Sequence, residues 1–129
     1  MKSAFKLTIA ALALVSFAGM AQAEGDAAKG EKVFKKCKAC HKVGEKAKKG
    51  VGPALNNIIG AKAGVQEGYK YSKAMIEKGK SGLVWDDENL DKYLKKPKDL
   101  VKGTKMAFPG LKKDADRADV IAYLKKFTQ

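Results

Sequence analysis

The sequence predicts an all-α domain with about four to five helices. Apolar residues after position 23 recur at spacings of three and four, which places them on one face of a helix. No segment alternates strictly between apolar and polar residues, as a half-buried strand does. Residues that cap helices precede several of these segments, and glycine or proline follows some of them. Residues 24–129 contain no internal repeat and are long enough for one domain but not for two, so a single domain is expected.

The first helix is expected to begin after Asp26, whose carboxylate can cap it, and to run through Gly30 and Phe34 to the cysteines. A glycine inside a helix costs about 1 kcal/mol relative to alanine, so close approach by another helix would explain Gly30. The glycines and lysines that follow, over residues 42–53, predict a solvated loop.

A short turn of helix is expected over residues 54–60. The next full helix is expected over residues 73–78, where Ser72 can cap its first turn. Gly79 is expected to end this helix, since glycine is the usual residue just past a helix terminus.

A further helix is expected to open at Asp86 or Asp87 and to stop at Pro97, which cannot continue it. Beyond this proline, the segment before Lys113 has no helical periodicity and is predicted to be a loop. The apolar stripe of the helix comprises Leu90, Tyr93 and Leu94.

The last helix is expected to start near Asp114. Acidic residues in its first turns, Asp116 and Asp119, and basic residues in its last turn, Lys125 and Lys126, complement the helix dipole. We expect its buried face to cross the first helix near Gly30 and Phe34. That face comprises Val120, Ile121, Leu124 and Phe127.

Residues 1–23 have the pattern of a cleaved secretory signal. Lys2 and Lys6 precede an apolar run over residues 7–18 that is too short to span a bilayer, and an Ala-Gln-Ala cleavage site ends at Ala23. We therefore expect cleavage after Ala23 and a periplasmic location. An uncleaved membrane anchor is the weaker alternative, because the run is short and ends in small residues.

Every cysteine and the single histidine of the chain lie within five residues: Cys37, Cys40 and His41. The CxxCH spacing is that of c-type haem attachment, in which each thiol bonds to the haem and the histidine becomes an axial iron ligand. A thioredoxin-like centre would need a βαβ context, a zinc site would need a fourth ligand, and a disulfide here would close too small a loop to stabilise much.

If a haem is bound, the far side of its iron is either open or filled by a second protein ligand. Because no other histidine exists, the candidates are lysine and the two methionines outside the signal, Met75 and Met106. Met75 lies in a helical pattern, where methionine usually fills the core. Met106 lies between glycines and a proline, in a segment able to fold over a flat group. Met106 is the preferred ligand, and Met75 remains the alternative.

The chain resembles the class I c-type cytochromes, and within them the bacterial cytochrome c2 and mitochondrial cytochrome c group. The resemblance runs from about Gly30 to Phe127. The motifs that carry it are CKACH at 37–41, GPAL at 52–55, GYKYS at 68–72, Trp85, YLKKP at 93–97, GTKMAFPG at 103–110 and DVIAYLKK at 119–126.

The resemblance implies helices wrapped around one covalently bound haem c, with the terminal helices crossing. His41 and Met106 would be the axial ligands, and the carbonyl of Pro53 would accept a hydrogen bond from Nδ1 of His41. Further residues are implied to line the haem pocket: Tyr71, Trp85, Tyr93, Thr104 and Phe108.

The function implied is one-electron transfer by a soluble monomer that is not an enzyme and is not embedded in a membrane. Such a carrier would shuttle electrons between membrane redox complexes, for example a quinol:cytochrome c oxidoreductase and a photosynthetic reaction centre or terminal oxidase.

The charge of the chain indicates the surface of its partners. The formal net charge is +13 at pH 7, from 27 basic and 14 acidic residues. If the lysines near the motif and the Met106 segment border one haem edge, they form a positive ring that would steer the protein to acidic docking surfaces. These lysines are Lys35, Lys36, Lys38, Lys42, Lys95, Lys96, Lys98, Lys102 and Lys105.

Two other classes of function are less compatible with this sequence. A haem enzyme or gas sensor, such as a peroxidase, would need an open iron position, which carbon monoxide binding would reveal. A basic nucleic-acid-binding module is disfavoured, since the chain has an export signal and lacks a base-reading motif.

Overall fold

The computed structural model describes residues 24–129, so the predicted signal over 1–23 lies outside the described residues. Extended pairing within this range is limited to one isolated antiparallel bridge, between Lys62 and Val84. The all-α prediction is therefore confirmed. The helices are α1 (Ala27–Phe34), α2 (Lys73–Lys80), α3 (Asp87–Lys95), α4 (Pro97–Leu100) and α5 (Asp114–Lys125).

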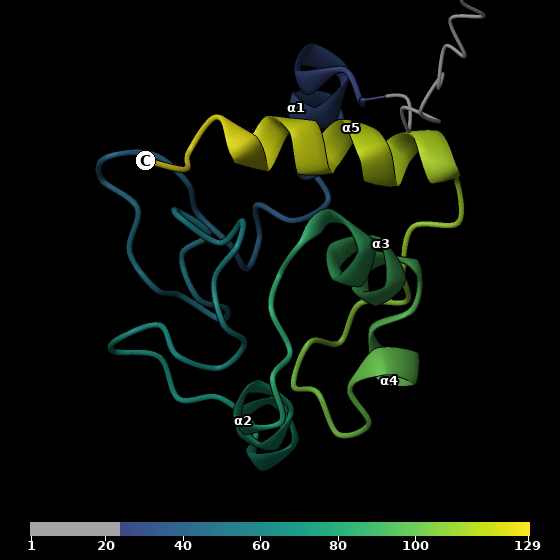
Figure 1. Ribbon diagram of the computed structural model, residues 1–129. Coiled ribbons are helices and arrows are strands. Elements are labelled where there is room, and N and C mark those ends of the chain that lie inside the picture. The colour runs from purple at the N-terminus through teal and green to yellow at the C-terminus, as the bar shows by residue number, and fades with distance from the viewer. Residues whose placement is uncertain (1–23) are drawn as a thin grey trace, which may run out of the picture.

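The first and last helices cross, as expected (Figure 1). Gly30 is buried at the crossing, where a Cβ atom would overlap the carbonyl oxygen of Asp119 and lie 2.8 Å from Cβ of Tyr123. One turn later, the rings of Phe34 and Tyr123 lie 5.3 Å apart between centroids, at an interplanar angle of 48°. The missing side chain at position 30 therefore lets the two backbones meet.

Replacing Gly30 with alanine should destabilise the protein, although alanine is the better helix former. The helical gain is about 1 kcal/mol, whereas forcing apart two packed elements costs about 1–3 kcal/mol, and here the obstacle is backbone. Denaturant unfolding of the haem-loaded protein measures the difference. Gly50→Ala is the control, because its Cβ would meet only the carbonyl oxygen of Cys40, at 3.6 Å. Equal stability of the two variants would contradict the expectation.

The start of α1 is fixed by two carboxylates. Asp26 caps it as predicted, and its side chain accepts hydrogen bonds from the backbone N–H groups of Ala28 and Lys29 at 2.9 and 3.1 Å. The carboxylate of Asp119, which comes from α5, accepts a hydrogen bond from the backbone N–H of Asp26 at 2.7 Å. Asp119 thus joins the two terminal helices, in addition to its place in the acidic half of α5.

The short helical turn expected over residues 54–60 is wrong. Asn57 and Gly60 have φ angles of 57° and 81°, which a right-handed helix does not allow. The backbone N–H of Asn57 donates to the carbonyl of Phe127, and that of Gly60 to the carbonyl of Trp85, both at 2.9 Å. These two backbone N–H groups therefore find their acceptors in distant parts of the chain, and not within a helical turn.

The capping of α2 by Ser72 is confirmed, since its hydroxyl accepts a hydrogen bond from the backbone N–H of Met75 at 3.1 Å. Gly79 does not end this helix, which runs on to Lys80. A Cβ atom at position 79 would overlap the carbonyl oxygen of Ala63. The glycine is therefore explained by the close passage of another segment.

The third helix is capped by Asp86, whose carboxylate accepts from the backbone N–H of Asn89 at 2.8 Å. It ends at Lys95, two residues before Pro97, as expected. Pro97 then starts α4, which corrects the expectation of a loop from this residue onward. Proline suits the first position of a helix because its φ is already helical and no N–H is needed there.

The residues that the structure describes contain no helix with the length and apolar character needed to cross a membrane.

Candidate haem-binding site

The centre of the fold holds a cavity of about 320 Å³, within the range of about 300–1,000 Å³ common for small-molecule and cofactor sites. Its walls come from the end of α1 and the turn after it, from residues 51–58, from α2, α3 and α5, and from the segments before α2, before α3 and after α4. Every residue predicted for the site lines this cavity. They are Cys37, Cys40, His41, Pro53, Tyr71, Trp85, Tyr93, Thr104, Met106 and Phe108.

The two thiols are held on the cavity wall by turns that follow α1. The backbone N–H of Cys37 donates to the carbonyl of Phe34, and those of Cys40 and His41 donate to the carbonyl of Cys37. Both cysteines are free and half-buried. Burial raises the pKa of the Cys37 thiol, partly offset by the positive charge of Lys36. The turn therefore brings both sulfurs and the imidazole to one cavity.

The His41 ring is oriented by a backbone acceptor, because its Nδ1 lies 2.8 Å from the carbonyl oxygen of Pro53. A carbonyl can only accept, so Nδ1 carries the proton and the Nε2 lone pair is free. Burial lowers the pKa of His41, and the hydrogen bond to Pro53 opposes this effect in part. A neutral imidazole with a free Nε2 is the form that binds a metal.

Gly52 is a site residue that the sequence reasoning missed. It is buried, and a Cβ atom there would lie 2.5 Å from Cε1 and 2.8 Å from Nδ1 of His41. The backbone therefore passes directly against the imidazole ring, which keeps the ring in place beside Pro53. The sequence feature that could have pointed to Gly52 is the Gly-Pro pair itself, since glycine often occurs where the backbone must approach another group closely.

The segment that carries Met106 is held by a pair of hydroxyl groups. Oγ1 of Thr104 lies 2.6 Å from the hydroxyl of Tyr93 and accepts a hydrogen bond from the backbone N–H of Met106 at 3.3 Å. The backbone N–H of Thr104 donates to the carbonyl of Val101, which is fully buried. The Met106 segment is thereby tied to α3 and to the end of α4.

Loss of the Thr104 hydroxyl should destabilise the protein by about 1–3 kcal/mol, because the buried Tyr93 hydroxyl loses its partner. Burial raises the pKa of Tyr93, and its hydrogen bond to Thr104 opposes this effect in part. Thr104→Val, Tyr93→Phe and the double variant form a thermodynamic cycle, measured by denaturant unfolding. We expect a coupling energy of about 1 kcal/mol, and additive effects would contradict it.

The other methionine outside the predicted signal, Met75, also lines the cavity and is 8% exposed. Both methionines thus lie on the cavity wall, and they differ in secondary structure. Met75 belongs to α2, whereas Met106 belongs to a segment without helix or strand.

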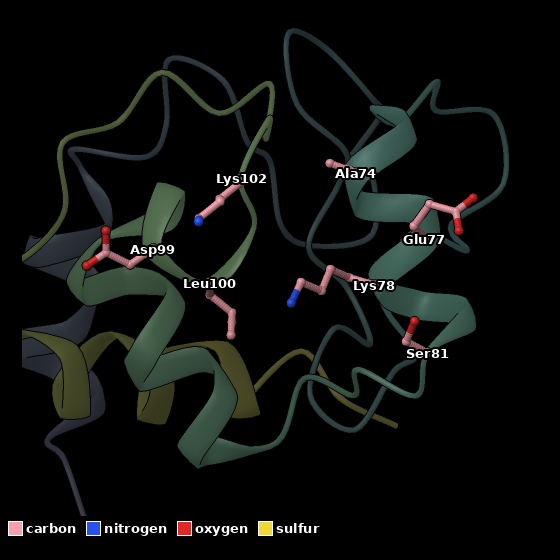
Figure 2. A pocket seen from close by; sticks show the side chains of 7 residues that line it. All are labelled: Ala74, Glu77, Lys78, Ser81, Asp99, Leu100 and Lys102. Atoms are coloured by element: carbon pink, nitrogen blue, oxygen red, sulfur yellow. The ribbon is translucent and has the colours of Figure 1, made fainter.

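A second, open pocket lies between α2 and α4, where Lys78 and Lys102 extend into the gap (Figure 2). None of the residues predicted for the site lines it. Its walls are formed by Ala74, Glu77, Lys78, Ser81, Asp99, Leu100 and Lys102.

The central cavity fits a covalently attached haem. It presents two free thiols, an imidazole with a free nitrogen and thioether sulfurs, within apolar walls. Across residues 24–129, no group of three or more His, Cys, Asp or Glu side chains is placed to hold a metal ion, which removes the zinc alternative. The thioredoxin-like alternative also fails, since this part of the chain has no βαβ unit.

Comparison with known proteins decides the family, because the family model described as cytochrome c matches residues 27–128. The chain belongs to the cytochrome c family. It is 55% identical over 121 residues to cytochrome c2 of Rhodomicrobium vannielii, covering 94% of each chain. It is 51% identical over 128 residues to cytochrome c-554 of Methylosinus trichosporium, covering 98% of this chain and 95% of that relative.

Solved structures agree with this assignment. The structure of cytochrome c2 from Rhodospirillum centenum matches with a TM-score of 0.78 and 43% identity, covering 81% of this chain and all of that one. The chain therefore has the class I cytochrome c fold and carries one covalently attached haem c, as the CxxCH motif indicated. It is an electron-transfer protein that acts with redox partners, and not an enzyme.

Proposed function

We propose that this cytochrome c is a soluble periplasmic carrier of single electrons, with haem bound through Cys37 and Cys40 and its iron ligated by His41 and Met106. It moves electrons between membrane redox complexes, for example from a quinol:cytochrome c oxidoreductase to a photosynthetic reaction centre or terminal oxidase. The observation that carries the proposal is the shared cavity, which is lined by both thiols, the oriented imidazole and the loop that carries Met106. We call residues 103–110 the Met106 loop.

The haem would supply an iron that cycles between the ferrous and ferric states. The chain fixes His41 against Pro53, so the imidazole keeps one tautomer and one orientation in both oxidation states. A thioether ligand from Met106 favours ferrous iron, and apolar walls disfavour the extra positive charge of ferric iron. These features would raise the reduction potential. Tyr71, Trp85 and Phe108 complete the walls around this group.

The positive charge of the chain supports docking to acidic surfaces. Lys36 and Lys105 are exposed side chains that line the rim of the cavity. Lys105 also donates a hydrogen bond to the carbonyl of Lys70 at 2.7 Å, which ties the Met106 loop to the segment before α2. A lysine ring around a monomer, meeting an acidic partner across a small interface, gives fast and short-lived complexes that weaken with salt.

Absorption spectra of the purified protein, oxidised and reduced, test the ligand assignment. We expect c-type haem spectra, a sulfur-to-iron charge-transfer band in the oxidised form, and no carbon monoxide binding by the native reduced form. Haem should stay with the wild-type chain after acid denaturation, because it is covalently attached. The double variant Cys37→Ala/Cys40→Ala should release its haem under the same conditions. Rapid carbon monoxide binding by the wild type would instead support a sensor or peroxidase. Sequencing of the exported protein should begin at Glu24.

A further inference from the structure

One charged side chain is buried without any part in the cavity. Arg117, on α5, is 3% exposed, and its guanidinium reaches acceptors on α3, at the start of α5 and in the segment just before α5. Its Nε donates to the carboxylate of Asp91 on α3 at 2.7 Å, and its Nη2 pairs with the carboxylate of Asp114. A buried charge is costly unless every donor is matched, so this arrangement needs a reason.

The remaining donor identifies the segment that Arg117 holds. Its Nη1 donates to the carbonyl of Leu111 at 2.8 Å and to the carbonyl of Lys112 at 3.2 Å. These two residues follow directly on the loop that carries Met106. The backbone N–H of Leu111 also donates to the carbonyl of Leu94 at 2.7 Å, and its side chain is 3% exposed. The carboxyl end of the Met106 loop is therefore tied to both α3 and α5.

We propose that Arg117 is a positioning residue for the axial methionine, acting through the carboxyl end of the Met106 loop. This inference rests on the proposed ligation of iron by Met106. The amino end of the loop is held by the hydroxyls of Tyr93 and Thr104, and Arg117 is its counterpart at the other end. With both ends fixed, the thioether has few positions available, so local opening of the loop becomes rare.

The geometry requires arginine at this position. The acceptors are two carboxylates on different helices and two consecutive carbonyls, which the planar guanidinium meets with separate N–H groups. A lysine ammonium at position 117 has three donors on one atom and cannot reach all four acceptors at once. Arg117→Lys should therefore keep the charge and lose part of the clamp.

The test compares Arg117→Met and Arg117→Lys with a control of similar cost to stability, Ile121→Ala. Ile121 is 6% exposed, lies on the same helix and is not part of the cavity wall. In the oxidised haem-loaded protein, we expect imidazole to displace the thioether about tenfold faster in Arg117→Met, which corresponds to about 1.4 kcal/mol less free energy for loop opening. Arg117→Lys should fall between this variant and the wild type, and Ile121→Ala should match the wild type.

Amide hydrogen exchange gives a readout that does not involve the iron. The Leu111 amide should exchange about tenfold faster in Arg117→Met, and the Ala63 amide, which donates to the carbonyl of Leu83, should stay as in the wild type. Equal imidazole rates in Arg117→Met and Ile121→Ala would overturn the inference and leave Arg117 a purely structural residue. If Arg117→Met does not fold, Asp91→Ala removes the acceptor of Arg117 Nε and is compared with Ile121→Ala in the same way.

The wild-type spectrum separates this inference from the proposed function. A wild-type protein without a sulfur-to-iron band overturns Met106 ligation and the role of Arg117 with it. If the wild type has the band, and imidazole displaces the thioether at the same rate in all three variants, only the role of Arg117 is overturned.

Discussion

Replacing Met106 with leucine lowers the reduction potential by on the order of a hundred millivolts or more, within the span of about 0.8 V that axial ligands control. The substitution keeps the apolar volume and removes the only sulfur that the loop presents to the cavity. The oxidised protein loses its sulfur-to-iron band, and the reduced protein binds carbon monoxide at the freed position. Potentiometric titration and carbon monoxide binding measure the two effects.

Met75→Leu is the matched control, because Met75 is the other methionine on the cavity wall and is almost fully buried. We expect it to leave the band in place and to exclude carbon monoxide. The reverse result, with the band lost in Met75→Leu and kept in Met106→Leu, would assign the ligand to α2.

Replacing Lys36 with glutamate slows association with an acidic redox partner by about three- to tenfold at low salt, because electrostatic steering supplies part of the on-rate. Lys36 is exposed at the cavity rim and has no ion pair within residues 24–129. It is a cleaner choice than Lys105, whose ammonium group is bound to the carbonyl of Lys70. Stopped-flow electron transfer at two ionic strengths measures the rate, and the difference should shrink as the Debye length falls to about 8 Å.

Lys29→Glu changes the net charge by the same amount on α1, at an exposed position away from the cavity wall. Its association rate should stay close to that of the wild type. Equal slowing in the two variants would mean that partners respond to total charge, and that the cavity rim is not the docking surface.

The starts of α1, α2 and α3 could be predicted because they are determined locally. Asp26, Ser72 and Asp86 each cap a helix with a side chain that lies within three residues of the N–H group it accepts. The stop before Pro97 is equally local. The segment over residues 54–60 could not be predicted, because its backbone N–H groups donate to Phe127 and Trp85, far away in the sequence.

Gly79 shows the same limit in a helix. Its sequence context is that of a helix end, and only the passage of Ala63 explains a glycine there. The burial of Arg117 could not be predicted either. An arginine near the charged start of a helix is usually a surface residue, and its acceptors on α3 and beside the Met106 loop are distant or non-helical.

The candidate site was more predictable than the backbone around it, because few residue types can do its chemistry. One histidine and two cysteines in one motif left little choice. The supporting contacts were harder to predict. The resemblance implied the carbonyl of Pro53, whereas the role of Gly52 depends on how close its backbone lies to the imidazole, which the sequence does not give.

The contact between the first and last helices has a consequence for the order of events during synthesis. A ribosome makes α1 and the two cysteines well before residues 114–125, so Gly30 and Phe34 have no surface to pack against until the chain is nearly complete. The domain can therefore close around the two cysteines only after its carboxyl end has been made.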